Sequence, residues 1–215
     1  MPFAIKPKQT VLFIGDSITD CGRRGAAAPM GDGYPAMIAE LVDARYPSLQ
    51  TKWINTGIGG NTIRDLTNRF YDDCIRHKPD WVSVKIGIND LHRWMANAGE
   101  NVSVSPEQYA DMYEGLMQRL KKETGAKIIL MDPFYISTES HAGMHRTNVL
   151  KELPKYIKTV HAMVKKHRTK HVKTHDLFHA ALKHHSPDRW CPEPVHPYRS
   201  GHLLMAQDWL KQMGY

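Results

Sequence analysis

The sequence predicts an α/β fold, a three-layer αβα sandwich with a central sheet of five parallel strands. Five short apolar runs, rich in β-branched and aromatic residues, recur along the chain. A helical pattern separates each run from the next, as crossovers between parallel strands require. With 215 residues, 41% of them hydrophobic, the chain can bury a core on both faces of such a sheet. We predict a single domain over residues 1–215.

Each predicted strand is too short for a buried helix and ends at glycine, proline or polar residues. The five runs are Val11–Ile14, Trp53–Thr56, Trp81–Ile86, Ile128–Met131 and, more weakly, His171–Thr174. Open parallel sheets keep their ligand sites beyond the carboxyl ends of the strands. Functional side chains are therefore expected directly after these runs.

The first two helices have clear boundaries. A helix is predicted over Tyr34–Tyr46 and stops at Pro47, because proline cannot continue a helix. The next begins after Thr62, which forms a capping-box pattern with Asp65, and ends before Pro79.

Three further helices follow. Ser105 as N-cap before a proline predicts a helix that Gly125 ends. A long basic helix is predicted over residues 147–167, with Pro154 as a candidate interruption. The last helix, over residues 198–213, ends at Gly214 and is expected to turn four side chains inward: Leu203, Leu204, Trp209 and Leu210.

The net charge of +7 and the pI near 9.3 raise the possibility of nucleic-acid binding. Nine Lys and Arg residues against two acids between residues 151 and 185 account for the whole excess. A solvated helix face is favoured over a binding patch there, and no nucleic-acid motif accompanies it. We predict no nucleic-acid or membrane partner. The chain has no apolar run of membrane-spanning length and its opening is too short and polar for a signal peptide, so a cytoplasmic location is predicted.

Metal binding is not predicted. Three cysteines without CxxC spacing favour neither a disulfide framework nor a zinc site. Seven histidines between residues 161 and 185 suggest a metal tract, but helix, strand and loop signals interrupt any shared face. Solvated side chains are expected for His161, His167, His171, His175, His179, His184 and His185.

Four short blocks carry candidate catalytic residues. Ser17 follows the first strand, and three glycines including Gly60 follow the second, where backbone N–H groups could approach a ligand. Asn89 follows the third strand, and His196 lies in a proline-rich loop with Glu193 three residues before it. Taken singly, each block has a structural alternative: a helix cap, a flexible turn, a turn-forming asparagine or a structural histidine.

Together the blocks GDSIT, GIGGNT, GIND and carboxylate-x-x-His resemble the SGNH hydrolases, also called the GDSL family of esterases and lipases. The resemblance covers nearly the whole chain and implies a flavodoxin-like sheet. Within the family, the segments GDSITDCG, GNTIRDL, KPDWVSVKIGIND and ILMDPFYI look most like bacterial carbohydrate esterases that deacetylate xylan oligosaccharides.

The resemblance implies Ser17 as nucleophile and His196 as general base, with no metal or organic cofactor. It implies an oxyanion hole of the Ser17 and Gly60 N–H groups and the Asn89 amide. The family usually has Asp where this chain has Glu193. Either Glu193 or Asp188 could therefore orient the histidine, and spacing favours Glu193.

Substrate contacts are expected from Asp16 and Asn61, which flank the site, and from Trp94 and Trp190, which could stack on sugar rings. For the tryptophans, core or rim packing is the alternative. The predicted activity is removal of short acyl groups from small-molecule or oligosaccharide esters, with a homo-oligomer as a further expectation. The alternatives are a lysophospholipase or thioesterase, and a non-catalytic ligand-binding module.

Overall fold

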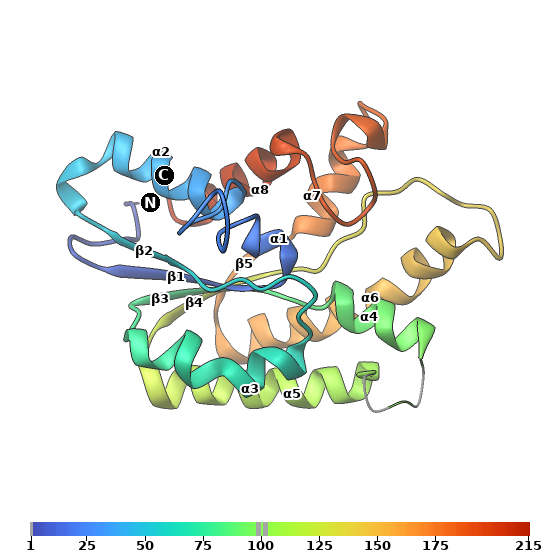
Figure 1. Ribbon diagram of the computed structural model, residues 1–215, viewed down its shortest axis with the longest axis horizontal. Coiled ribbons are helices and arrows are strands. Elements are labelled where there is room, and N and C mark those ends of the chain that lie inside the picture. The colour runs from blue at the N-terminus through green and yellow to red at the C-terminus, as the bar shows by residue number, and fades with distance from the viewer. Residues whose placement is uncertain (1, 98–99, 101–102) are drawn as a thin grey trace.

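The computed structural model describes residues 2–97, 100 and 103–215. Its centre is a five-stranded sheet in the order β2-β1-β3-β4-β5, in which all neighbouring strands are parallel (Figure 1). The strands are β1 (Thr10–Gly15), β2 (Lys52–Asn55), β3 (Trp81–Lys85), β4 (Lys127–Met131) and β5 (Lys170–Val172). The predicted parallel sheet is confirmed, with strand ends that differ by one or two residues.

Helices cover both faces of the sheet, as predicted. The helices α1, α2, α7 and α8 lie on one face, and α3, α4, α5 and α6 lie on the other (Figure 1). Their bounds are α1 (Ser17–Asp20), α2 (Tyr34–Arg45), α3 (Ile63–Asp73), α4 (Ile88–Ala96), α5 (Pro106–Arg119), α6 (His145–His167), α7 (Thr174–Ala181) and α8 (Arg199–Gln212). Three short 3-10 turns are η1 (Pro47–Leu49), η2 (Ile75–His77) and η4 (Pro187–Arg189), and η3 (Leu120–Thr124) is a π-helical segment that continues α5.

The predicted helix starts match the structure closely. Thr62 and Asp65 form a complete capping box at α3, and Ser105 forms one with Gln108 at α5. In each box two orphan backbone N–H groups find side-chain acceptors, which stabilises the start of the helix. Gly125 takes the left-handed conformation, with φ of 67°, where the segment after α5 ends.

The expected interruption at Pro154 does not occur, because α6 runs unbroken for 23 residues. A proline inside a helix costs about 3 kcal/mol. Leu153, Tyr156 and Val160 are fully buried on either side of it. Each buried side chain of this size contributes about 1.5–3 kcal/mol, so packing outweighs the lost hydrogen bond.

One other expectation is wrong, because Leu203 is 42% exposed. Trp209 and Leu210 are buried on α8 as predicted, together with Met205 and Ala206, and Leu204 is partly buried. The segment after β3, for which a turn-forming Asn89 was one alternative, is a helix, α4.

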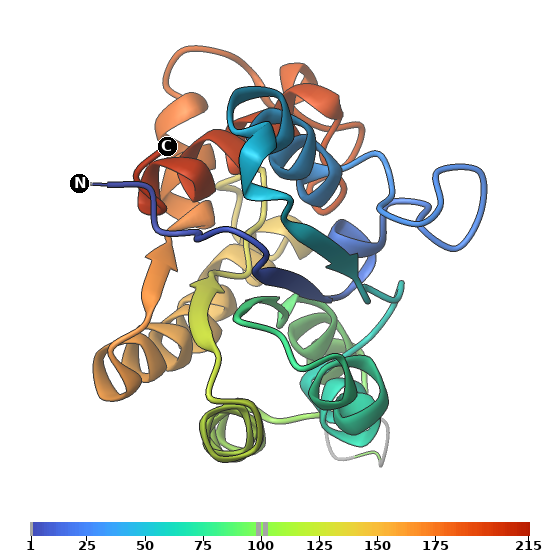
Figure 2. The same ribbon diagram turned by 90° about the vertical axis from the view of Figure 1, so that its left-hand side faces the viewer.

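The hydrophobic core lies on both faces of the sheet and includes buried residues from β1, β3, β4 and β5, while Trp53 and Ile54 of β2 are partly buried and pack against it. The two chain ends meet at the amino edge of the sheet (Figure 2), where the Ala4 N–H donates to the Met213 carbonyl at 2.8 Å. No helix within the described residues is both long enough and apolar enough to span a bilayer.

Candidate active site

Ser17 lies where β1 gives way to α1, and the sheet reverses its strand order at this point. Strand β2 lies on one side of β1, and β3 lies on the other side. The connections that follow β1 and β2 therefore run in opposite directions, which opens a crevice at the carboxyl ends of these strands. Gly15 allows the tight turn, because a Cβ there would lie 2.3 Å from the Lys85 carbonyl oxygen and 2.5 Å from Thr19 Oγ1. The sequence Gly-Asp-Ser therefore places a half-buried serine at the crevice.

Ser17 contacts the predicted histidine, which follows it by 179 residues, and that histidine contacts the predicted carboxylate. Ser17 Oγ lies 2.7 Å from His196 Nε2. His196 Nδ1 forms a short hydrogen bond with the Glu193 carboxylate. This chain of contacts can move a proton from the serine hydroxyl to the imidazole while the carboxylate fixes the ring tautomer.

Glu193 organises the loop that carries the histidine. Its carboxylate also accepts the N–H groups of Val195 at 2.9 Å and His196 at 2.8 Å. Burial raises the pKa of the Glu193 carboxyl, the hydrogen bonds from Val195 and His196 lower it, and the resulting pKa lies below the usual value. The Ile136 N–H donates to the Pro194 carbonyl, which anchors the loop to the rest of the molecule. The Tyr198 N–H donates to the Trp190 carbonyl and closes the base of the loop.

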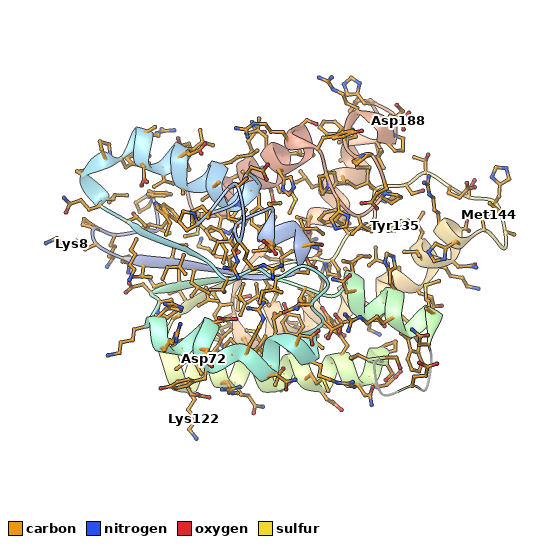
Figure 3. The ribbon with its side chains drawn as sticks, viewed as in Figure 1. Lys8, Asp72, Lys122, Tyr135, Met144 and Asp188 are labelled. Carbon is orange, nitrogen blue, oxygen red and sulfur yellow. The ribbon has the colours of Figure 1, made fainter. Side chains whose placement is uncertain are left out.

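Asp188, the alternative partner, does not contact the histidine in the structure. It lies on the exposed turn η4 at the rim of the molecule (Figure 3). The geometry therefore brings Glu193, and not Asp188, to His196.

Three hydrogen-bond donors surround the serine. The N–H groups of Ser17 and Gly60 have no acceptor among the described residues. Asn89 Nδ2 donates to the Asn61 carbonyl at 3.0 Å, which leaves its second N–H for another acceptor. The glycine loop runs close by, because a Cβ on Gly59 would lie 3.8 Å from Ser17 Cβ. Such donors can stabilise an oxyanion that develops on a substrate carbonyl.

Comparison with known proteins agrees with this geometry. Residues 13–204 match the GDSL-like Lipase/Acylhydrolase family. The chain belongs to this family. It is accordingly a carboxylic ester hydrolase, a serine esterase that removes acyl groups.

An acetylxylan esterase of Geobacillus stearothermophilus is 37% identical to this GDSL-family chain, over 96% of the chain and 94% of the relative. The crystal structure of Axe2, an acetylxylan esterase from the same organism, superposes with a TM-score of 0.89 at 34% identity and covers 99% of this chain and 97% of its own. LAE5, an α/β hydrolase enzyme from the metagenome of Lake Arreo, has the same TM-score at 27% identity, covering 99% and 98%.

Asp16 is not placed to bind substrate, contrary to the sequence-based expectation. It is fully buried, its carboxylate accepts the Ile18 N–H at 3.0 Å, and it pairs with the fully buried Lys85 at 3.2 Å. Burial lowers the pKa of the Lys85 ammonium, and Asp16 opposes that shift. Lys85 also lies 4.8 Å from the centre of the Phe134 ring. The pair fixes the turn beneath Ser17, and the alternating pattern of β3 gave no signal for a buried lysine.

We expect Lys85→Met to lower the free energy of unfolding by about 3–5 kcal/mol, because it leaves the Asp16 carboxylate buried without a counter-charge. Urea denaturation followed by circular dichroism measures this. The double variant Lys85→Met/Asp16→Asn should recover most of the loss, since asparagine removes the charge and can still cap Ile18. A single variant as stable as the parent would show that the pair is not needed.

The other predicted substrate contacts are also placed by the structure. Asn61 Oδ1 accepts the Arg69 Nε–H at 2.7 Å, so this side chain is engaged within the protein. Trp190 packs against the core and its ring lies 6.0 Å from that of His185. Trp94 is half-buried on α4, three residues after Leu91. Neither tryptophan lines the two hollows at the serine.

These two hollows, of about 260 and 250 Å³, both include Ser17 and Cys21. The first is lined further by Asp32, His196, Arg199 and His202, among others. The second contains Asp20 and Arg24, which form an ion pair at 2.7 Å. Arg24 and Asp32, from the segment after α1, thus border the nucleophile, and no motif had marked these two residues.

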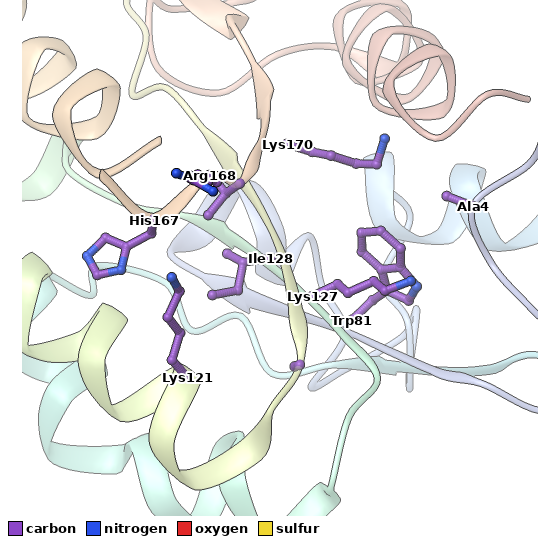
Figure 4. Close-up of a pocket in the computed structure, with 10 residues that line it drawn as sticks. Ala4, Trp81, Lys121, Lys127, Ile128, His167, Arg168 and Lys170 are labelled. Atoms are coloured by element: carbon purple, nitrogen blue, oxygen red, sulfur yellow. The ribbon is translucent and has the colours of Figure 1, made fainter. Parts of the chain in front are cut away.

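A separate hollow of about 410 Å³ lies at the opposite, amino edge of the sheet (Figure 4). It is lined by Trp81 and by basic side chains that include Lys121, Lys127, Arg168 and Lys170. Lys127 lies over the Trp81 ring at 5.2 Å, and Lys170 Nζ donates to a backbone carbonyl. No serine and histidine pair lines it, so it is distinct from the active-site crevice.

The expectation that the late histidines are simply solvated is wrong for five of them. His179 Nε2 lies 3.3 Å from the Tyr135 carbonyl oxygen, and the rings of His175 and His179 lie 4.2 Å apart. His167 Nε2 lies 3.0 Å from Glu114, and its side chain is only 7% exposed. His161 and His171 both contact Asp132. The sequence did not indicate the contacts to Glu114, Asp132 and Tyr135 because these partners come from distant segments.

Proposed function

We propose that this esterase removes acetyl groups from acetylated xylan oligosaccharides or closely related carbohydrate esters, with Ser17, His196 and Glu193 as its catalytic triad. The observation that carries the proposal is the contact chain from Ser17 Oγ through the His196 ring to Glu193, beside three available N–H donors. The activity named for the 37% identical relative supports the substrate class.

In the acylation step, Ser17 Oγ attacks the ester carbonyl carbon as His196 Nε2 accepts the hydroxyl proton. Glu193 accepts the Nδ1–H and stabilises the imidazolium that forms. The N–H groups of Ser17, Gly60 and Asn89 donate to the oxyanion of the tetrahedral intermediate. The intermediate then expels the sugar oxygen, which takes the proton from Nε2 and leaves as an alcohol.

Deacylation repeats the sequence with water. His196 Nε2 accepts a proton from the water molecule as its oxygen attacks the acetyl-serine carbonyl. Collapse of the second tetrahedral intermediate releases acetate and returns the proton to Ser17 Oγ. Every proton transfer is made by the protein's own side chains, and the step sequence requires no cofactor.

The spacing between Glu193 and His196 matches that between an aspartate and a histidine of Axe2. Three catalytic mutants of Axe2 have crystal structures, in which a serine, an aspartate or a histidine is replaced by alanine. The aspartate precedes the histidine by three residues. The spacing from Glu193 to His196 is the same. In this chain the loop turns back so that two backbone N–H groups donate to the Glu193 carboxylate.

A hydrolysis profile tests the substrate class. We expect acetylated xylo-oligosaccharides and aryl acetates to be hydrolysed, and turnover of aryl esters to fall steeply from acetyl to octanoyl, because the hollows at Ser17 are small and bordered by charged groups. A lysophospholipase or thioesterase would instead prefer the long chains. Inactive Ser17→Ala protein serves as the control for contaminating esterases.

Asn89→Ala should lower kcat by about 10²–10³-fold with little change in KM, because its N–H would bond the oxyanion more strongly than the substrate carbonyl. Initial rates on an aryl acetate over a range of concentrations separate the two constants. A change confined to KM would reassign Asn89 to substrate binding.

The remaining expectations stay predictions: a single domain over residues 1–215, a cytoplasmic location and self-association into a homo-oligomer. Sedimentation of the purified chain measures the last of these.

A further inference from the structure

Two histidines and a buried aspartate converge at the β4–β5 side of the sheet. Asp132 directly follows β4, His161 lies on α6 and His171 lies on β5. His161 Nε2 lies 3.0 Å from Asp132 Oδ2, and His171 Nε2 lies 2.7 Å from Asp132 Oδ1. One ligand atom from each of the three residues lies within 4.8 Å of the others.

The carboxylate of Asp132 is directed at these two rings. Its side chain is 1% exposed, and the two imidazoles are its hydrogen-bond partners among the described residues. The backbone of Asp132 is engaged separately, with its N–H donating to Val172 and its carbonyl accepting from Thr174. The whole carboxylate is therefore available to the two histidines.

We propose that Asp132, His161 and His171 bind a divalent transition metal of the zinc type. Imidazole nitrogen and carboxylate oxygen are the ligands such ions prefer, at about 2.0–2.2 Å. Tetrahedral bonds of that length place neighbouring ligand atoms about 3.3 Å apart. The observed separations of 2.7 and 3.0 Å need to open by only a few tenths of an ångström. The metal replaces the Nε2 protons that otherwise join the rings to the carboxylate.

The site has an access route. The His161 side chain is 39% exposed. His171 lines a hollow of about 450 Å³ together with Asp208 and with Asp176 and Lys173, which form an ion pair at 3.9 Å. Three protein ligands leave at least one coordination position for water.

Bound metal would join three consecutive parts of the chain: the residue after β4, the crossover helix α6 and strand β5. A ligand that binds the native chain and not the unfolded chain stabilises the native state. The site is thus expected to act on stability, and it lies two strands away from the strand that carries Ser17.

Titration of tag-free, metal-stripped protein with Zn²⁺ in a calorimeter tests the proposal. We expect one ion per chain, and a melting temperature raised by about 5–10 °C at a zinc concentration 100 times the dissociation constant. His161→Gln and His171→Gln should each weaken binding at least about 100-fold. The matched control is His184→Gln, at an exposed histidine outside the cluster, which should bind zinc like the parent.

Binding of Co²⁺ to the unaltered protein provides a second readout that does not depend on variants folding. Visible d–d absorption of tetrahedral or five-coordinate cobalt, displaced by one equivalent of Zn²⁺, supports the site. Absence of zinc binding to the unaltered chain, or equal affinity in His161→Gln, His171→Gln and His184→Gln, would overturn it.

Discussion

Replacement of Ser17 by alanine is expected to lower kcat/KM on an activated acetyl ester by at least about 10⁴-fold. The oxygen that would attack the ester is lost, and the remaining N–H donors and His196 cannot form an acyl-enzyme. Hydrolysis rates are measured at an enzyme concentration far above that of any contaminating esterase. Mass spectrometry then tests whether the acetyl-serine adduct forms.

The same variant should remain folded. Ser17 is half-buried, and His196 is the one partner of its hydroxyl among the described residues, while the adjacent Asp16 side chain caps the turn without it. The free energy of unfolding should therefore change by no more than about 1 kcal/mol. Turnover retained in well-folded Ser17→Ala protein would rule out this nucleophile.

Glu193→Gln is expected to lower kcat by about 10³–10⁴-fold. The two oxygens of Glu193 have different partners: one accepts the Val195 N–H, and the other accepts the His196 N–H and faces the His196 ring. A glutamine oxygen in the first position can still accept the Val195 N–H. Its NH₂ group can face the imidazole, however, which favours the tautomer that leaves Nε2 protonated and unable to accept the Ser17 proton. Steady-state rates on an aryl acetate measure the effect.

Two further variants complete this test. Glu193→Asp restores the usual family carboxylate but shortens the reach to the ring, so it should be much more active than Glu193→Gln. Asp188→Asn is the matched control on exposed η4 and should keep nearly the parent rate. If Asp188→Asn were the inactive enzyme and Glu193→Gln the active one, the assignment of the third triad member would be wrong.

Local sequence signals predicted much of the fold because they act over a few residues. The capping boxes at Thr62 and Ser105 fix helix starts by contacts three residues apart. The strand-end positions of Ser17, Gly60 and Asn89 followed from parallel topology, and their family blocks indicated which of many strand-end residues to select.

Long-range contacts escaped prediction. Asp16 looked accessible beside Ser17, but Lys85, buried in the middle of the sheet and 69 residues later, draws its carboxylate inward. His161 and His171 shared no periodic face, yet a helix and a strand bring both rings to Asp132. Such pairings depend on the packing of whole elements, which spacing along the chain does not record.

The two halves of the catalytic apparatus rest on different supports. Ser17, Gly60 and Asn89 stand at the ends of neighbouring hydrogen-bonded strands, whereas His196 and Glu193 stand on one loop tied down by a few backbone bonds, such as that from Ile136 to Pro194. Local opening of that loop disturbs far less of the core than opening of the sheet. Under mild denaturant, catalysis should therefore be lost before the sheet unfolds, through withdrawal of the base from an oxyanion hole that is still assembled.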